Sequence, residues 1–303
     1  MDRREFLHKF TMYSTGAIMT SPIFNIIPPV LAKMAQPNLC VGVDNNYKTL
    51  VQKTIAPLGG MSAFVKKGDR VVVKPNIGWD RKPEQAANTN PQVVKTIVEL
   101  ALASGASKVQ VFDRTCNADR LCYTNSGIQQ AVASIGDSRA ICEYIDQRKF
   151  IPVTIKNGKS LKEWPLYKDA LAADCYINVP VAKHHRLAGL TLGLKNVMGI
   201  MGGERGRAHS NIGQNLADLG TVLKPELTVI DATRILLNNG PQGGNLNDVK
   251  TLHTLIATTD IVAADAYATT LFGMKPEDIE STKAAYAMGL GEMHLNRMKI
   301  IKV

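Results

Sequence analysis

The sequence lacks the patterns that identify several common cofactor sites. It contains five cysteines in 303 residues but no C-x-x-C pair, which argues against an iron–sulfur cluster or a structural zinc site built from cysteine alone. Neither G-x-x-x-x-G-K-[ST] nor a G-x-G-x-x-G after the first predicted strand is present, which disfavours nucleotide binding by those two modes. H-E-x-x-H is absent too, so the chain shows no metal motif of fixed spacing.

Acidic residues are few relative to basic ones. The chain has 26 Asp and Glu against 36 Lys and Arg, a formal net charge of +10. This balance favours acidic partners, such as anionic metabolites, acidic proteins or lipid headgroups. Nucleic acid is not expected as a partner, because no basic helix or aromatic platform is visible.

Residues 1–32 are interpreted as a targeting segment. Residues 3–7, R-R-E-F-L, are close to the twin-arginine export pattern, and residues 30–32 offer the small side chains that a signal peptidase needs. A membrane-spanning helix fits less well, because prolines and polar residues interrupt the apolar stretch. We therefore expect a partnership with the twin-arginine machinery and export, already folded, to the periplasm or cell envelope, with the segment either cleaved or retained as a tether.

The cysteines leave one pairing open. Cys116 and Cys122 are close enough in sequence for a local disulfide in an oxidising compartment, and the simpler interpretation is that the cysteines are buried small residues. The full set is Cys40, Cys116, Cys122, Cys142 and Cys175.

Short β-branched runs alternate with longer helical patterns, which predicts an α/β fold of two Rossmann-like lobes with mainly parallel sheets. Expected strands are 39–43, 70–74, 108–112, 173–179, 226–230, 251–257 and 299–303. Expected helices are 47–56, 91–103, 127–135, 212–223, 263–271 and 281–288.

The pattern changes between residues 151 and 164, where alternating residues flank Asn157-Gly158, a strong hairpin signal. We place a boundary there between an N-terminal lobe, 38–150, and a C-terminal lobe, 151–303. The hairpin could equally extend a sheet rather than link two lobes.

Residues 183–210 hold the densest chemistry of the chain. Cations and histidines alternate there with leucines and glycines, and Glu204 is the one acid. Cationic side chains beside apolar packing are costly without a partner, so the segment predicts an anion site, with a solvated basic loop as the alternative. The cations and amides expected to hold the anion, here and after an earlier strand, are Lys74, Asn76, Lys195, Asn196 and Arg205, with His209 able to close over it.

Polar residues also follow the ends of the predicted strands, where ligands bind in open α/β sheets. Asp113, Asp231 and Asp260 each stand after a strand, and single aspartates there are more often helix caps than ligands. Together with a histidine, Asp231 and Asp260 could still bind a divalent metal. Asn76 could likewise be a turn residue that satisfies its own loop.

His184 and His185 cannot face the same way if they are adjacent in extended backbone. His184 is preferred as the acid/base group, since the neighbouring Lys183 would lower its pKa and keep the imidazole neutral. His184, Lys183 and Asp113 are thus the candidate catalytic residues, and His184 is also the candidate histidine ligand of a metal.

The chain resembles the domain-of-unknown-function family numbered 362. The resemblance rests on V-V-V-K-P-N at 71–76, N-V-P-V-A-K-H-H at 178–185, G-L-T-L-G-L-K-N-V-M-G at 189–199 and A-M-G-L-G at 287–291. Some relatives carry iron–sulfur clusters, but this chain lacks the cysteine run that would hold one. A looser fold-level analogy is to the nickel-dependent lactate racemases, and it implies a small hydroxy acid or another carboxylate as substrate.

Two functional hypotheses follow. The first is an exported enzyme that binds a small carboxylate or phosphate between the lobes and moves a proton, with or without a metal or cofactor. The second is a non-catalytic envelope protein that delivers a cofactor or metal to a redox complex through the same pocket.

Overall fold

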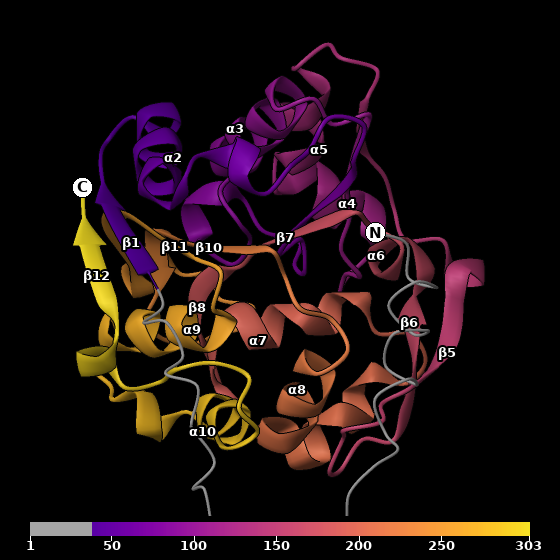
Figure 1. Ribbon diagram of the computed structural model, residues 1–303, viewed down its shortest axis with the longest axis vertical. Helices are drawn as coiled ribbons and strands as arrows, with labels where there is room; N and C mark the ends of the chain where they lie inside the picture. The colour runs from indigo at the N-terminus through magenta and orange to yellow at the C-terminus, as the bar shows by residue number, and fades with distance from the viewer. Residues whose placement is uncertain (1–37) are drawn as a thin grey trace, which may run out of the picture. The chain divides into compact units, whose positions relative to one another are not determined.

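The structure is a computed structural model, and it describes residues 38–303. A ten-stranded sheet forms the centre of the protein (Figure 1). Its strands are β1 (Asn38–Val43), β2 (Arg70–Pro75), β3 (Lys108–Val111), β4 (Ala140–Cys142), β7 (Cys175–Val179), β8 (Val181–His185), β9 (Gly189–Thr191), β10 (Leu227–Leu236), β11 (Val249–Thr258) and β12 (Lys299–Lys302). The order is β12-β1-β11-β10-β7-β2-β3-β4, with β8 beside β10 and β9 beside β8. Most neighbours are parallel; β11 is antiparallel to β1 and β10, and β9 to β8. The predicted α/β class with a mostly parallel sheet is confirmed.

Helices cover both faces of this sheet (Figure 1). On one face lie α2 (Tyr47–Ile55), α3 (Pro91–Ala103), α4 (Asp119–Asn125) and α5 (Ile128–Ala133); on the other lie α7 (Gly193–Asn196), α8 (Ile212–Gly220), α9 (Ile261–Thr270) and α10 (Glu280–Ala287). Successive side chains of a strand point to opposite faces, so Val71 and Val73 join one buried cluster and Val72 joins the other. Each fully buried valine of this kind contributes about 1.5–3 kcal/mol.

Helix α3 shows how local sequence sets an element. The Asn90 side chain accepts a hydrogen bond from the Gln92 N–H at 3.0 Å, and Pro91 occupies the first turn. Val94 and Ile97 lie on its buried face, and Gly105 just beyond it has φ 99°. The helix spans Pro91–Ala103, as the sequence predicts.

The predicted hairpin forms a sheet of its own, with β5 (Phe150–Thr154) antiparallel to β6 (Glu163–Tyr167). A bridge between Leu166 and Met201 ties β6 to the basic segment, and the short helix α6 (Lys168–Leu171) follows. Strands from both sides of residue 150 pair within the ten-stranded sheet, and residues 38–303 belong to one compact unit. The division into two lobes stays a prediction.

The basic segment is more regular than its glycine content indicates. Lys183 and His185 lie on β8, and a turn with Gly189 at φ 72° leads to β9 and then to α7. Within residues 38–303 no helix has the length and hydrophobicity to span a bilayer. The predicted targeting segment, 1–32, lies outside the described residues.

Candidate functional site

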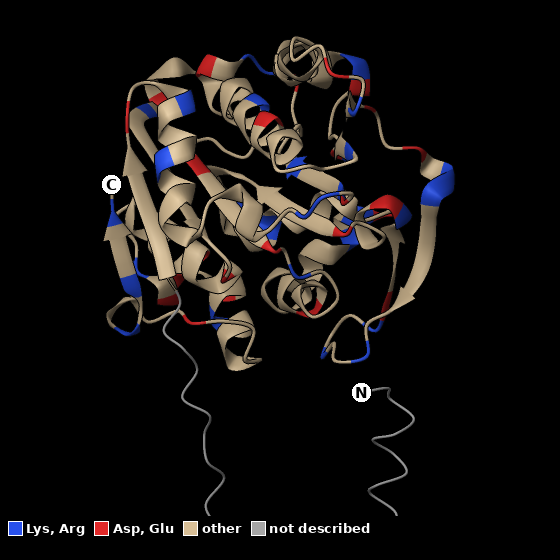
Figure 2. Ribbon diagram, turned by 45° about the horizontal axis from the view of Figure 1, so that its top comes forward, with Lys and Arg blue, Asp and Glu red and all other residues tan. Residues whose placement is uncertain are grey.

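A cleft of about 860 Å³ opens beyond the carboxyl ends of β2, β3 and β7. Six Lys or Arg side chains and two histidines line it, against two carboxylates. Lys and Arg positions accordingly lie in loops at the centre of the molecule as well as on its outer surface (Figure 2). The charged and histidine lining residues are Lys74, Asp113, Arg114, Lys183, His185, Arg186, Lys195, Glu204, Arg205 and His209.

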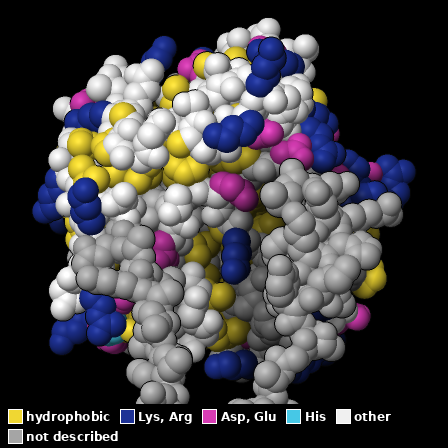
Figure 3. Space-filling view, viewed as in Figure 1, with side chains coloured by type: hydrophobic (Ala, Val, Ile, Leu, Met, Phe, Trp, Pro, Cys, Tyr) yellow, Lys and Arg dark blue, Asp and Glu magenta, His cyan; other side chains and the backbone are white. Residues whose placement is uncertain are grey.

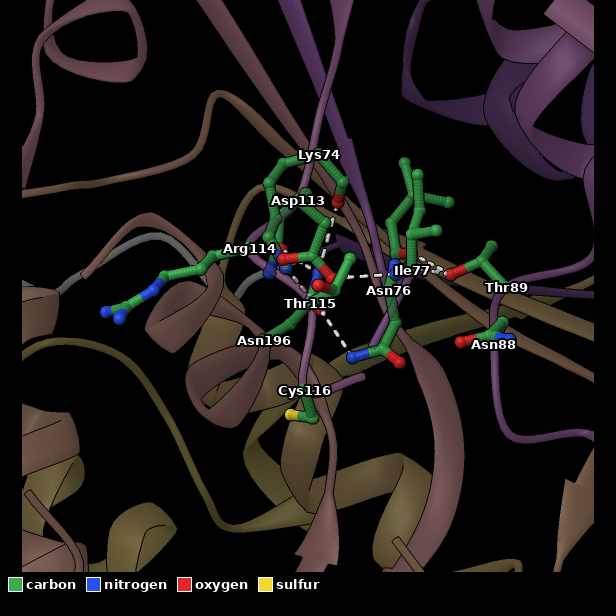
Figure 4. Close-up of polar contacts among 12 residues, drawn as sticks. Lys74, Asn76, Ile77, Asn88, Thr89, Asp113, Arg114, Thr115, Cys116 and Asn196 are labelled. Atoms are coloured by element: carbon green, nitrogen blue, oxygen red, sulfur yellow. Dashed lines mark hydrogen bonds and ion pairs between the residues drawn. The ribbon is translucent and has the colours of Figure 1, made fainter. Parts of the chain in front are cut away.

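The floor of the cleft is an ion pair buried against an amide (Figure 4). Lys74 Nζ lies 2.8 Å from Asp113 Oδ1 and donates to Asn196 Oδ1 at 2.7 Å, with both charged side chains at most 2% exposed. Asp113 Oδ2 accepts the Ile77 N–H at 2.7 Å. Burial lowers the pKa of Lys74, and the carboxylate beside it opposes that shift. Lys74 and Asp113 therefore neutralise each other.

Asn76 connects this floor to Lys183. Its Oδ1 accepts from Lys183 Nζ at 3.0 Å, and its Nδ2 donates to Asn196 Oδ1 at 3.4 Å. Lys183 also donates to the Ala87 carbonyl, so its described hydrogen-bond partners are uncharged oxygens. Burial lowers the pKa of Lys183 to about 7. An amine that titrates near neutrality can both accept and donate a proton.

Helix α7 carries two residues of the cleft and is anchored at both ends. At its start the Asp265 carboxylate accepts the backbone N–H groups of Gly193 at 2.6 Å and Leu194 at 3.0 Å. At its end Asn196 Nδ2 donates to the Lys74 carbonyl and to Asn178 Oδ1, at 3.1 and 2.8 Å. The backbone that bears Lys195 is thus fixed from two sides.

The Lys195 amine makes no hydrogen bond and no ion pair within residues 38–303, although Lys195 lines the cleft. Burial, together with the charge of Arg205, lowers the pKa of Lys195 to about 8. Figure 3 shows one face of the molecule, on which hydrophobic side chains gather beside scattered Lys and Arg side chains.

His185 and His209 stack in the cleft, with ring centroids 5.8 Å apart and planes at 16°. His185 Nδ1 accepts the N–H groups of Leu187 and Ala188, both at 3.2 Å, which leaves the proton of the neutral ring on Nε2. Burial and the nearby Lys195 lower the pKa of His185 to about 3 and also lower that of His209. Both rings are therefore neutral near pH 7.

On one wall of the cleft, Arg205 contacts the loop after β3. The Arg205 guanidinium donates to the Arg114 carbonyl at 2.7 Å, to the Thr115 carbonyl at 3.0 Å and to Cys116 Sγ at 3.3 Å. Arg114 in turn donates to the Met201 carbonyl at 2.7 Å. Glu204, the second carboxylate of the lining, is 82% exposed and lies 3.9 Å from Arg207. It therefore does little to neutralise the interior of the cleft.

Three predicted residues lie outside the lining. His184 Nδ1 accepts the Gly240 N–H at 3.1 Å, so the histidine of β8 that reaches the cleft is His185, not the preferred His184. Asp231 accepts from the Asn90 and Thr233 N–H groups, and Asp260 caps α9 through the Val262 and Ala263 N–H groups. Asp260 thus has the helix-capping role that was the alternative to metal binding, whereas Asp231 lies within β10 and its carboxylate ties that strand to the start of α3.

Potential metal ligands are scattered among the described residues. Within residues 38–303 no three His, Cys, Asp or Glu side chains come together as a metal site, and His184, Asp231 and Asp260 do not share one. The five cysteines are free thiols, with Cys116 exposed and Cys122 buried. Because the described residues show no such group, we derive no step through a metal or a cluster.

The cleft also contains residues that the sequence analysis did not assign to a binding or catalytic role, among them Arg114, Cys116, Thr191 and His185. The signal for His185 was present, because side chains two apart in a strand share a face and Lys183 and His185 are so spaced. Arg114 and Cys116 come from an irregular loop for which no periodicity exists. Their place in the cleft follows from the tertiary fold.

Fold and site together define an α/β protein with a cationic cleft at the carboxyl edge of a mostly parallel sheet. The chain belongs to the family described as "Domain of unknown function (DUF362)", which matches residues 71–270 and so includes every residue of the cleft named above. It is similar to a thylakoid-associated protein of Synechocystis sp., with 28% identity over 244 residues that cover 78% of this chain and 73% of the relative.

Two solved structures are similar to part of this chain. The lactate racemase apoprotein of Thermoanaerobacterium thermosaccharolyticum has a TM-score of 0.50 at 11% identity, covering 77% of this chain. A Thermotoga maritima protein has a TM-score of 0.47 at 12% identity, covering 75% of this chain. This chain spans 56% and 59% of the two solved chains, which is less than two thirds of either.

Proposed function

We propose that this protein binds a small anion, a carboxylate or a phosphate, in the cationic cleft and moves a proton there. One observation carries the proposal. Asp113 is engaged by Lys74, so the remaining cations of the cleft have no carboxylate at ion-pair distance among the described residues. These cations are Arg114, Lys183, Arg186, Lys195 and Arg205. Positive charge gathered in a partly buried cleft is stabilised when an anion enters.

The size of the cleft agrees with a small-molecule ligand. Its volume of about 860 Å³ falls within the usual range of about 300–1,000 Å³ for such sites. The lining also has apolar parts, including Trp79 and Met198, which would contact the carbon skeleton of an organic anion. This composition favours a carboxylate over inorganic phosphate.

Lys183 is the group best suited to move the proton. Its pKa of about 7 allows both protonation states near neutral pH, whereas His185 with a pKa of about 3 stays neutral. The proton-transfer role that the sequence predicted for His184 is therefore proposed for Lys183. In this proposal His185 donates an Nε2–H hydrogen bond to the ligand.

Calorimetry with a panel of anions tests binding. The wild type should bind lactate, acetate and phosphate, and more weakly as the salt concentration rises. Lactate is included because a similar solved structure is that of a lactate racemase apoprotein. Lys195→Met should weaken binding by about tenfold or more, because it removes an unneutralised cation. Lys156→Met is the matched control, since Lys156 is exposed in the hairpin turn and outside the cleft. Equal affinity in both variants would contradict the proposal.

Exchange of a hydrogen atom of the ligand for deuterium distinguishes an enzyme from a non-catalytic carrier protein. In D₂O an enzyme should exchange the Cα–H of a bound 2-hydroxy acid, and Lys183→Met should abolish the exchange measured by proton NMR. Binding without exchange for any acid of the panel would favour the envelope protein that delivers a cofactor or metal to a redox complex.

The cellular location is a separate proposal. We propose that the segment 1–32 directs the folded chain to the periplasm or cell envelope through the twin-arginine machinery. Replacing Arg3 and Arg4 by lysine should retain the protein in the cytoplasm, as cell fractionation would show. Unchanged fractionation of that variant would refute twin-arginine export.

A further inference from the structure

The three lysines of the cleft differ in what their amines contact. Lys74 is paired with Asp113, and Lys183 donates to Asn76 Oδ1 and the Ala87 carbonyl. Lys195 has neither kind of partner within residues 38–303, although it lines the same cleft. Among the described residues, the Lys195 amine therefore has no contact to give up when it binds a ligand.

A second unengaged group lines the cleft. Thr191 Oγ1 is buried and has no hydrogen-bond partner among the described residues, and the residue is 2% exposed. Buried hydroxyls without a partner are uncommon, because leaving one unpaired costs about 1–3 kcal/mol. A hydrogen bond between this hydroxyl and a ligand atom in the cleft would remove that cost.

The surroundings of Lys195 fit the chemistry of an amine nucleophile. The helix that carries Lys195 is anchored through Asp265 and Asn196. The cations Arg205 and Arg114 line the same cleft, where they would bind a carboxylate. Burial and Arg205 lower the pKa of Lys195 to about 8, so about a tenth of the amine is unprotonated at pH 7, far more than for an ordinary lysine. An unprotonated amine beside a carboxylate site suits a carbonyl carbon placed next to that carboxylate.

We propose that Lys195 forms an imine with the C2 carbonyl of a small 2-oxo acid whose carboxylate lies among the cations of the cleft. This rests on the proposed function and names its ligand class. The ammonium form of Lys195 first releases one proton to water, and the Nζ lone pair so freed attacks C2 while the carbonyl π electrons move to oxygen. That oxygen takes up one of the two amine protons and then the released proton, and it leaves as water. One C=N bond replaces one C=O bond, and the iminium keeps the single positive charge of the lysine.

Reductive trapping tests the imine. The full chain is incubated with pyruvate and sodium cyanoborohydride, and the adduct is located by peptide mass mapping. We expect one major adduct on Lys195, lost in Lys195→Arg, which keeps the charge but cannot form the imine. Lys156→Arg, at an exposed lysine outside the cleft, should leave the adduct unchanged.

A second measurement uses only the wild-type protein, so its result does not depend on whether a variant folds. An acid without a carbonyl, lactate, should protect Lys195 from trapping by occupying the cleft. Pyruvate that binds by calorimetry but leaves no adduct on Lys195 would overturn the imine and leave the proposed function standing. If no carboxylate binds at all, both fail, and adducts spread evenly over surface lysines would refute the site.

Discussion

The Asp265 carboxylate on α9 accepts the backbone N–H of Gly193, the first residue of α7, at 2.6 Å. A second bond from the Leu194 N–H, at 3.0 Å, engages the other oxygen. Asp265 is 1% exposed, and burial raises its pKa to about 7 despite these two donors. A buried acid thus holds the short helix that presents Lys195 and Asn196 to the cleft.

Asp265→Asn should change the pH dependence of stability. The folded pKa of Asp265, about 7, lies above its usual value of 3.8, so between these values the folded state binds more protons than the unfolded state. The contribution of Asp265 to the free energy of unfolding therefore declines as pH rises from about 4 to about 7. The difference between wild type and Asp265→Asn should shrink over that window in urea unfolding.

Asp218→Asn provides a control of opposite sign. Burial acts to raise the pKa of Asp218, but N–H donors from Leu161, Lys159 and Ser160 hold it below the usual value. Its contribution to stability is present above the unfolded pKa and is lost as pH falls through the folded pKa. The same pH trend in both variants would show that Asp265 does not titrate as described.

Lys74 and Asp113 should be strongly coupled. Lys74→Met leaves the buried Asp113 carboxylate without its cation and should lower the free energy of unfolding by about 3–5 kcal/mol. The double variant Lys74→Met, Asp113→Asn buries no charge at the pair, so its loss should be well below the sum of the single losses. Guanidinium unfolding of the four proteins measures this, and additive losses would contradict the coupling.

Gly199→Ala should disturb the same pair by steric overlap. A Cβ at Gly199 would overlap Asp113 Oδ1 and Lys74 Nζ, whereas at Gly206, also in the cleft lining, nothing stands within 4 Å. We expect Gly199→Ala to lower the free energy of unfolding by about 1–3 kcal/mol or more and Gly206→Ala to change it by no more than about 0.5 kcal/mol. Equal thermal midpoints for the two variants would refute the contact.

Cys116 should be the thiol most reactive towards an anionic reagent. It is exposed, unlike the other four cysteines, and its Sγ accepts from the Arg205 guanidinium at 3.3 Å. The positive charge of the Arg205 guanidinium attracts an anionic reagent to this thiol. Iodoacetate should therefore alkylate Cys116 first, and Arg205→Gln should slow iodoacetate more than the neutral iodoacetamide, as peptide mapping would measure. Equal slowing of both reagents would rule out an electrostatic effect of Arg205.

Local patterns in the sequence were sufficient for much of the secondary structure. All seven expected strands and all six expected helices are present, with ends that differ by a few residues, because β-branched runs and periodic apolar faces are local signals. The short β4 was missed, as were β8 and β9, whose lysine, histidines and glycines read as a loop. Pairing with β10 overrides that local preference.

The α/β class, the family and the concentration of positive charge in one segment could be predicted from the sequence, because each follows from residue types and their spacing. How these charges are used depends on the tertiary structure. Lys74 is neutralised by Asp113, whereas Lys195 has no partner within residues 38–303, although both are lysines beside apolar residues. The partners of these lysines come from elements that are distant in the sequence. Because side chains alternate between the two faces of β8, His185 lies on the face of Lys183 and His184 does not. Contacts across the sheet, not neighbours in sequence, set which charge remains available to a ligand.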